Sequence, residues 1–189
     1  MARPREFETN KALAKAMDVF WQRGYSDATL PDLLAGMNLT RGSLYKAFKD
    51  KKSLFLLVLS NYDEQAVGEA VDLLTNPEQD GLERISELFG SIVLRTVAGD
   101  RRGCLLCSAI SGPASYDSDI AEHALRSLDR MRGAFQVALQ ASMSSSDATR
   151  YTPMLVSQYV GLQVMSQSSV PASMIRDSVE AIGLVLQKV

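Results

Sequence analysis

Hydrophobic residues recur at every third or fourth position along most of this chain, which is the spacing of amphipathic helices. The first stretch carries its apolar stripe at Leu13, Ala16, Met17, Phe20 and Trp21, and Gly24 follows as a helix end. Strand-like alternation is absent from the sequence, as is any internal repeat. The pattern predicts an all-α protein of about nine helices, the later ones at 51–74, 82–97, 104–110, 119–142, 151–168 and 173–187.

Helix-end signals between residues 25 and 55 predict two short helices joined by a tight turn. Thr29 is a suitable N-cap, with Pro31 in the first turn and Asp32 at the capping-box position, for a helix that runs to Met37. Asn38 tolerates the left-handed conformation that a helix end requires. Thr40 is then the N-cap of a second helix at 41–48, and the pair forms a helix-turn-helix.

The second of these helices has the residues of a DNA reader, because in a helix-turn-helix its first residues lie nearest the base edges. Arg41 suits a two-bond contact with guanine, and Gly42 allows close approach to the duplex. Leu44, Ala47 and Phe48 are expected to face inward. An ordinary helical hairpin with a basic surface is the alternative. The predicted DNA contacts are Arg3, Arg5, Thr29, Thr40, Arg41, Gly42, Ser43, Tyr45, Lys46 and Lys51.

Two flanking segments extend this predicted surface. Residues 1–5 form a short basic arm whose Arg3 and Arg5 could reach a minor groove or phosphates. Asp50 is placed to cap the next helix, and Lys51 and Lys52 in its first turn are expected to converge with free N–H groups on one phosphate.

This segment resembles the TetR (tetracycline-repressor-type) family of transcriptional regulators. The resemblance rests on Phe20, Gly24, Tyr25, Thr29, Leu33, the run 41–48, Lys51, Leu54 and Phe55, with Asn38 where the family usually has Gly. It implies a helix-turn-helix domain at 1–55 and a helical ligand-sensing and dimerisation domain at 56–189. It also implies a homodimer on a palindromic double-stranded operator, from which a small molecule of unknown identity releases it.

Charge divides unevenly along the 189 residues, whose net charge is −2. Residues 1–60 hold ten Lys or Arg against six Asp or Glu, and the remainder holds ten against sixteen. Basic character at one end fits sequence-specific DNA binding better than non-specific coating of DNA. The sequence shows neither a leader nor a bilayer-long apolar run, so we expect a cytoplasmic protein without membrane contact.

The last two predicted helices are poor in charge, and residues 151–169 hold no Asp, Glu, Lys or Arg. A helix without a polar face is expected to be covered on most sides. The family resemblance places these helices in a four-helix dimer interface, for which we predict Leu155, Tyr159, Leu162, Ile182 and Leu186. The alternative is burial within the monomer.

Apolar and aromatic residues of the C-terminal region are the candidate effector contacts, although the same spacing is typical of ordinary core packing. They are Phe89, Val93, Tyr116, Met131, Phe135 and Tyr159.

Cys104 and Cys107 open a short predicted helix after two arginines, and a helix N-terminus and nearby cations are expected to lower a thiol pKa there. A thiol-based sensor of oxidants or electrophiles is therefore an alternative to a reversible effector, as is plain burial of both thiols. No metal site, cofactor or enzyme motif is expected, since His123 is the one histidine and no phosphate loop or nucleophile elbow is present. A helical protein-binding adaptor is a remote alternative.

Overall fold

The computed structural model describes residues 3–187, with side chains from residue 9 onward, and this part of the chain is helical without a strand. Its α-helices are α1 (Arg3–Asp27), α2 (Leu30–Met37), α3 (Arg41–Phe48), α4 (Lys51–Tyr62), α5 (Gly68–Thr75), α6 (Gly81–Val97), α7 (Leu105–Ser111), α8 (Ser118–Gln140), α9 (Ser145–Ser166) and α10 (Ala172–Leu186). A π-helical turn, η1 (Asp63–Val67), joins α4 to α5, and a 3-10 turn, η2 (Pro113–Tyr116), follows α7.

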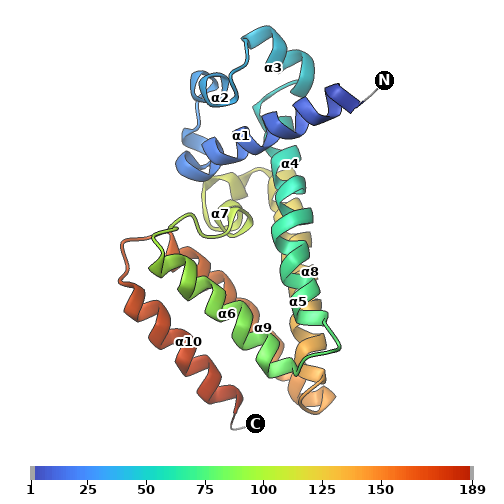
Figure 1. Ribbon diagram of the computed structural model, residues 1–189, viewed down its shortest axis with the longest axis vertical. Helices are drawn as coiled ribbons and strands as arrows, with labels where there is room; N and C mark the ends of the chain where they lie inside the picture. Colours follow the sequence, from blue (N-terminus) through green and yellow to red (C-terminus); the bar gives the residue numbers. More distant parts are fainter. Residues whose placement is uncertain (1–2, 188–189) are drawn as a thin grey trace.

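Two helical bodies share one long rod (Figure 1). Helices α1 to α3 form a small head at one end, and α4, η1 and α5 run from that head into the C-terminal body. Because α4, η1 and α5 follow one another without a break, the described residues make nine helical rods, which confirms the predicted all-α architecture.

The core of the head is aromatic. Phe20 of α1 packs edge-on against Phe55 of α4, with ring centroids 4.8 Å apart, and Leu33 and Leu44 are fully buried beside them. The first turns of the rod therefore complete the core of the head. We infer that movement of α4 must carry the head with it.

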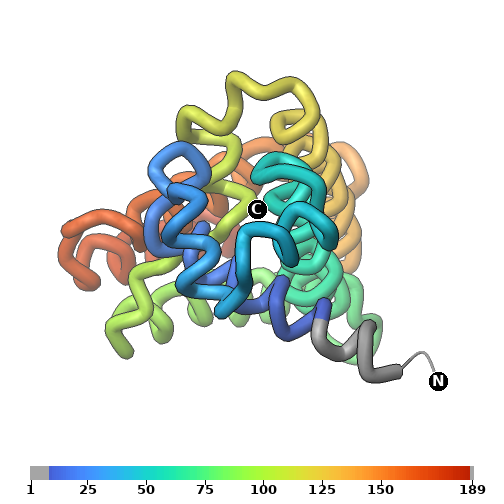
Figure 2. Tube along the Cα trace, turned by 90° about the horizontal axis from the view of Figure 1, so that it is seen from above, coloured from blue at the N-terminus to red at the C-terminus, as the bar shows by residue number. Residues whose placement is uncertain are grey.

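The C-terminal body wraps around α8, which packs against α5, α6, α7 and α9. Helix α10 lies along α6 and α9 on the outside of this body. Figure 2 looks down on the molecule from the side of the head, which lies in front of the C-terminal body. None of the helices in the described stretch combines the length and hydropathy that crossing a bilayer requires.

Two helix starts differ from the sequence-based expectation. Helix α1 begins at Arg3, so the basic residues expected in an arm continue the helix. Helix α9 begins at Ser145 rather than near Tyr151, because Ser144 caps it by accepting the Asp147 N–H at 3.2 Å. The expected helix end at Gly24 is confirmed by its φ of 75°, and a short turn to Asp27 follows.

Candidate nucleic-acid interface

Helix α2 begins with the predicted capping box. The Thr29 hydroxyl accepts the Asp32 N–H at 3.3 Å, and the Asp32 carboxylate accepts the Thr29 N–H at 3.0 Å. The Thr29 hydroxyl also donates to that carboxylate at 2.6 Å, and these bonds lower the pKa of Asp32. The start of the helix-turn-helix is thus fixed by bonds between residues only three positions apart.

The turn between α2 and α3 is closed by Asn38 in the left-handed conformation, with φ 55° and ψ 46°. Its N–H donates to Ala35 and that of Leu39 donates to Leu34, at 3.2 and 3.0 Å. Thr40 then caps α3 by accepting the Ser43 N–H at 3.2 Å. The family resemblance leads us to expect Gly at this position. The turn nevertheless forms with Asn38, as we predicted from the ability of Asn to adopt the left-handed conformation.

Helix α3 has one buried edge and one open face. Leu44 and Phe48 are buried as expected, whereas Ala47 is exposed, which corrects the prediction that it faces inward. Ala47 therefore lies on the solvent-exposed side of this short helix. The open face carries all five of the predicted recognition-helix contacts, namely Arg41, Gly42, Ser43, Tyr45 and Lys46.

Within that face, neighbouring side chains hold one another in place. The Arg41 guanidinium lies 5.7 Å from the centroid of the Tyr45 ring, and the Ser43 and Thr40 hydroxyls are 2.9 Å apart. A Cβ atom added at Gly42 would meet nothing within 4 Å, so the glycine leaves open space beside Arg41. This arrangement presents two cations, hydroxyls and a bare stretch of backbone on one surface.

The two lysines at the start of α4 do not converge on one point, which corrects that expectation. Lys51 donates to the Ser26 carbonyl oxygen at 3.2 Å and lies 4.8 Å from the centroid of the Tyr25 ring, and burial lowers its pKa. Lys52 instead forms ion pairs with Asp117 at 2.8 Å and Asp119 at 2.7 Å. A phosphate contact by Lys51 stays a prediction.

The predicted cap of α4 is present, since Asp50 accepts the Ser53 N–H at 2.7 Å. The side chains of Arg3 and Arg5 lie outside the described residues, and their contacts with DNA also stay predictions.

The predicted effector residues are mostly packed against one another. Phe135 lies between Phe89 and Tyr159, with ring centroids 5.9 and 6.1 Å away, and all three are buried. Tyr116 is 92% exposed in η2, so it does not belong to this packed layer, and its role as an effector contact stays a prediction. Val93 is half-buried, and Met131 lines a cavity of about 10 Å³, too small for more than one water.

Both cysteines border that small cavity, together with Tyr159, and both are free thiols with about 2% exposure. The pKa of Cys104 is lowered by the Cys107 thiol and, more weakly, by the Tyr62 hydroxyl, while its burial acts the other way. The same contact and burial raise the pKa of Cys107. Cys104 is therefore the more readily ionised thiol of the pair.

The five residues predicted for the dimer interface are buried within the subunit, which corrects that prediction. Leu155, Tyr159, Leu162, Ile182 and Leu186 all have 7% exposure or less without a second chain present. The three residues of α9 belong to a helix that packs against α8 and α6, and the two residues of α10 belong to a helix that packs against α6. The monomer core, proposed as the alternative, accounts for these positions.

The contacts that join the head to the C-terminal body could not be predicted from the sequence. Arg102 lies over the Trp21 ring at 4.5 Å from its centroid, and it reaches Asp18 at 3.8 Å. Together with the Lys52 ion pairs, these contacts connect α1 and α4 to the 99–103 loop and the start of α8. Their partners are far apart in sequence, so no local spacing could have indicated them.

Comparison with known proteins shows that the chain is similar to helix-turn-helix transcriptional regulators. The family model described as "Bacterial regulatory proteins, tetR family" matches residues 12–58, which span the head and the start of the rod. The uncharacterized HTH-type transcriptional regulator YezE of Bacillus subtilis (strain 168) is 28% identical over 136 residues, covering 71% of this chain and 70% of that protein. The HTH-type transcriptional repressor ComR of Escherichia coli (strain K12) is 29% identical over 120 residues, covering 63% and 57%.

A solved structure extends the similarity to nearly the whole chain. A cysteine mutant of the TetR family transcriptional regulator CifR, complexed with 26-base-pair double-strand operator DNA, superposes with a TM-score of 0.77 and 29% identity. The match covers 94% of this chain and 95% of that one. The head and the C-terminal body are thus both present in a protein described as bound to an operator.

Proposed function

Because this chain belongs to the TetR family of DNA-binding transcriptional regulators, we propose that it is a repressor that binds a palindromic operator as a homodimer. A small molecule bound in the C-terminal body then releases it from DNA. The observation that carries the proposal is the open face of α3, where Arg41 and its exposed neighbours stand on a helix fixed by caps at both ends of the turn.

The roles within that face follow from side-chain chemistry. Arg41 is the residue suited to a paired contact with guanine, because a guanidinium donates two parallel hydrogen bonds. Tyr45 and Lys46 are suited to phosphate oxygens, which fix the register of the helix on the duplex. The hydroxyls of Thr29 and Thr40 are already bonded within their caps, and the Thr29 N–H donates to Asp32. We therefore propose that these two threonines support the DNA-binding face mainly by fixing the starts of α2 and α3.

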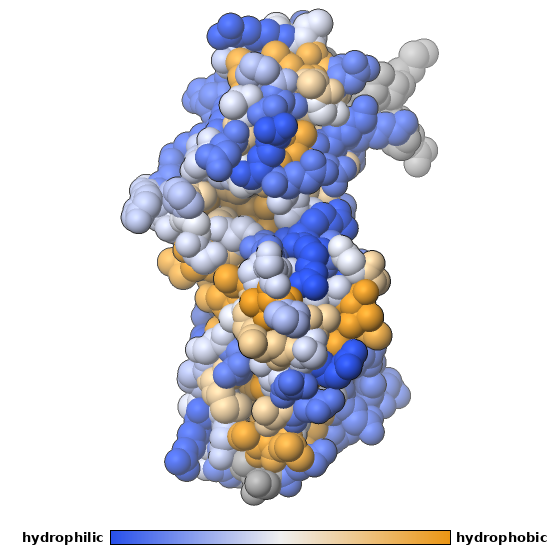
Figure 3. Space-filling model, turned by 90° about the vertical axis from the view of Figure 1, so that its left-hand side faces the viewer, coloured by the Kyte–Doolittle hydropathy of each residue, from blue (hydrophilic) through white to orange (hydrophobic). Residues whose placement is uncertain are grey.

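A homodimer is supported by exposed small and apolar residues on the outer helices. The open stripe of α9 consists of Pro153, Ser157, Gly161 and Val164, and that of α10 includes Met174, Ala181, Leu184 and Val185. Figure 3 views the molecule from the side on which α10 lies in Figure 1 and shows hydrophobic areas over the C-terminal body. These residues replace the buried set as the proposed interface, and two-fold pairing would place two α3 helices for a palindromic site.

Release by an effector requires a state of the C-terminal body with a larger cavity than the one described. An effector shifts the equilibrium only if it binds the DNA-incompetent state more tightly. The layer formed by Phe89, Met131, Phe135 and Tyr159 is the proposed place of opening, because α6, α8 and α9 meet there.

Selection of genomic fragments by the purified protein, near physiological salt, tests the main proposal. Enrichment of one palindromic sequence is the expected result, and the flanking genes would indicate the class of effector. Salt-sensitive retention without any enriched sequence would contradict sequence-specific reading by α3.

A second candidate function is thiol-based sensing of electrophiles or oxidants, which the lowered pKa of Cys104 favours. A thiolate is the reactive form of cysteine, and Cys104 lies at the start of α7, beside Tyr62 on the rod. Brief alkylation of the folded protein followed by mass spectrometry tests this function. Selective labelling of Cys104 is expected, and two unreactive thiols would rule the sensor out.

A further inference from the structure

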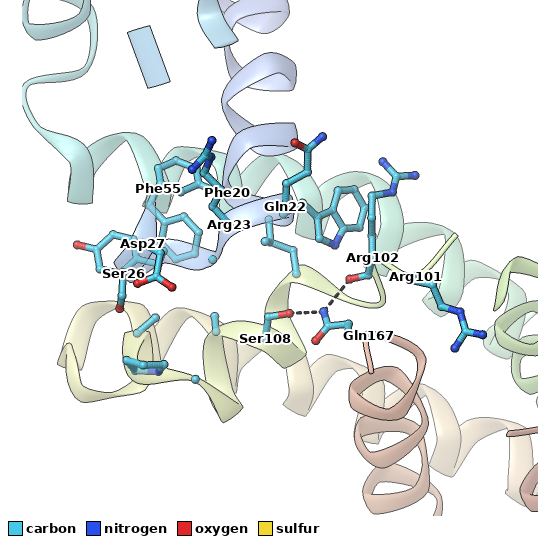
Figure 4. Close-up of a pocket in the computed structure, with 18 of the residues that line it drawn as sticks. Phe20, Gln22, Arg23, Ser26, Asp27, Phe55, Arg101, Arg102, Ser108 and Gln167 are labelled. Atoms are coloured by element: carbon cyan, nitrogen blue, oxygen red, sulfur yellow. Dashed lines mark hydrogen bonds between the residues drawn. The ribbon is translucent and has the colours of Figure 1, made fainter. Parts of the chain in front are cut away.

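A groove of about 740 Å³ separates the head from the C-terminal body (Figure 4). One wall is the end of α1, including Gln22, Arg23 and Ser26. The opposite wall is the 99–102 loop, the outer face of α7, and Gln167 at the end of α9. Its volume is in the range of small-molecule sites, which is about 300–1,000 Å³.

The groove is separate from the cavity beside the cysteines, and α7 lies between the two. Ser108 and Ala109 line the groove, whereas Cys107 and Ile110 line the small internal cavity. A molecule in the groove would therefore contact the outer face of α7 and leave the thiols untouched.

Cationic groups predominate on the walls. Arg23, Arg101 and Arg102 line the groove together with the carboxylates of Asp27 and Asp100, and Arg23 is already paired with Asp32 at 3.3 Å. Asp100 is already engaged, because it accepts from Arg102 at 2.9 and 3.0 Å. Among the residues that the structure describes, Arg101 has no carboxylate within ion-pair distance. Its guanidinium donates only to two backbone carbonyl oxygens, at 2.8 and 3.3 Å.

The floor of the groove is apolar. Phe20, Phe55, Leu105 and Ala109 lie behind it with at most 2% exposure, so the half-buried rings of Trp21 and Tyr25 provide the apolar surface that a ligand can reach. Above this floor, the Gln167 amide donates to the Arg102 carbonyl oxygen at 2.6 Å and to the Ser108 hydroxyl, as the dashed lines in Figure 4 mark. A ligand that fits both parts needs an apolar body and an anionic group.

We propose that this groove is a second small-molecule site, which takes an organic carboxylate with an apolar body of medium size. The carboxylate binds at Arg101 and Arg102, and the apolar body packs against the partly exposed rings of Trp21 and Tyr25 on α1. The site goes beyond the effector cavity of the proposed function, because it lies outside the C-terminal core and its walls belong to both bodies.

Binding there would act on contacts that already join the two bodies. Arg102 reaches Asp18 on α1 and covers Trp21, and it also donates twice to Asp100. A carboxylate that engages Arg102 therefore competes with Asp18 and Asp100 for the same guanidinium. Occupation of the groove is therefore expected to alter the freedom of the head, and DNA would alter the affinity for the ligand by the same factor.

The test uses Trp21, which lines the groove and is the only tryptophan of the chain. Full-length protein labelled with 5-fluorotryptophan gives one protein ¹⁹F resonance, which is followed during titration with octanoate. Octanamide, which has the same apolar body without the charge, is the matched control ligand. A saturable shift with octanoate and a much weaker one with octanamide is the expected result.

Two variants locate the bound carboxylate. Arg101→Gln is expected to weaken octanoate about tenfold, the size of one lost charge-assisted hydrogen bond. Arg150→Gln removes an exposed arginine of α9 outside the groove and is expected to leave the affinity unchanged. The proposal is overturned if no saturable shift occurs, if octanamide binds equally well, or if Arg101→Gln has no effect. None of these titrations contains DNA, so their outcome is independent of whether an operator is found.

Discussion

The central carbon of the Arg102 guanidinium lies over the Trp21 ring, 4.5 Å from its centroid. This contact joins the loop before α7 to the C-terminal part of α1, and Trp21 in turn packs edge-on against Tyr62 of the rod, with centroids 5.2 Å apart. One cation–π contact and one aromatic pair thus connect the loop, the head and the rod.

Replacement of Arg102 by Gln should weaken the connection between the loop and the head without creating a cavity in the core. We expect the free energy of unfolding to fall by about 0.5–1 kcal/mol, the usual size of a cation–π contact at a partly exposed site. The emission of Trp21 should shift to longer wavelength as water reaches the ring. Urea unfolding followed by tryptophan fluorescence measures both effects, and Arg150→Gln is the control. Equal stability and emission in both variants would show that the contact contributes nothing.

The capping box of α2 makes the head sensitive to acid. The Thr29 hydroxyl and N–H hold the pKa of Asp32 below its ordinary value of 3.8, so the folded state favours the ionised carboxylate. Its contribution to stability is complete above that ordinary value and is lost as the pH falls through the lowered pKa. Thr29→Ala removes the cap itself and should cost about 1 kcal/mol at neutral pH.

Asp32→Asn separates the charge from the cap. The stability deficit of this variant should be present at pH 7 and should shrink as the pH drops below about 3.8. Thermal unfolding between pH 7 and pH 3 gives the comparison, with Asp72→Asn on the exposed side of α5 as the control. A deficit that stays constant down to pH 3 would contradict the proposed role of the Asp32 charge.

The head could be predicted from the sequence because its determinants are local. Thr29, Asn38, Thr40 and Asp50 each act on residues within four positions, so spacing alone indicates the helices, the turn and the caps. Ala47 was misplaced because a small apolar residue carries no signal for which side of a short helix is covered.

The C-terminal body was harder to predict because its surfaces depend on distant partners. The apolar residues of α9 and α10 indicate that one face is covered, but the same pattern results from a neighbouring helix or from a second subunit. Leu155 and Ile182 are covered by the subunit itself. The exposed stripe through Gly161 and Val164 contains small residues, so its hydrophobicity is too weak to indicate an interface from the sequence. The groove beside Trp21 escaped prediction for the same reason, since its walls come from four separate segments.

The proposed division of roles on α3 predicts two different losses of DNA binding. Arg41→Ala should cost about 1–3 kcal/mol on the operator and should relax the preference at one base pair. Lys46→Ala should weaken all sequences to a similar extent and reduce the slope of log affinity against log salt by about 1. Binding to operator and random duplexes across a salt series distinguishes them, and identical behaviour of the two variants would refute the division.

The proposed dimer interface can be tested directly, because an exposed valine lies inside it and another lies outside it. These are Val164 of α9 and Val137 of α8. Val164 is 37% exposed on the small-residue stripe, beside Gly161, where an added Cβ would meet nothing of its own subunit within 4 Å. Val164→Arg should introduce a charge between the two subunits and convert the dimer into monomers. Operator affinity should fall with it, because each α3 alone then contacts one half-site.

Val137→Arg on α8 is the control, since this valine is 45% exposed and lies outside the proposed interface. Sedimentation over a range of protein concentrations, with unfolding curves to confirm that both variants fold, gives the oligomeric state. A Val164→Arg variant that remains dimeric, or a Val137→Arg variant that dissociates, would move the interface away from α9 and α10. Monomers formed only by Val164→Arg would connect the charge-poor segment at 151–169 to subunit pairing, through its exposed stripe rather than through the buried leucines.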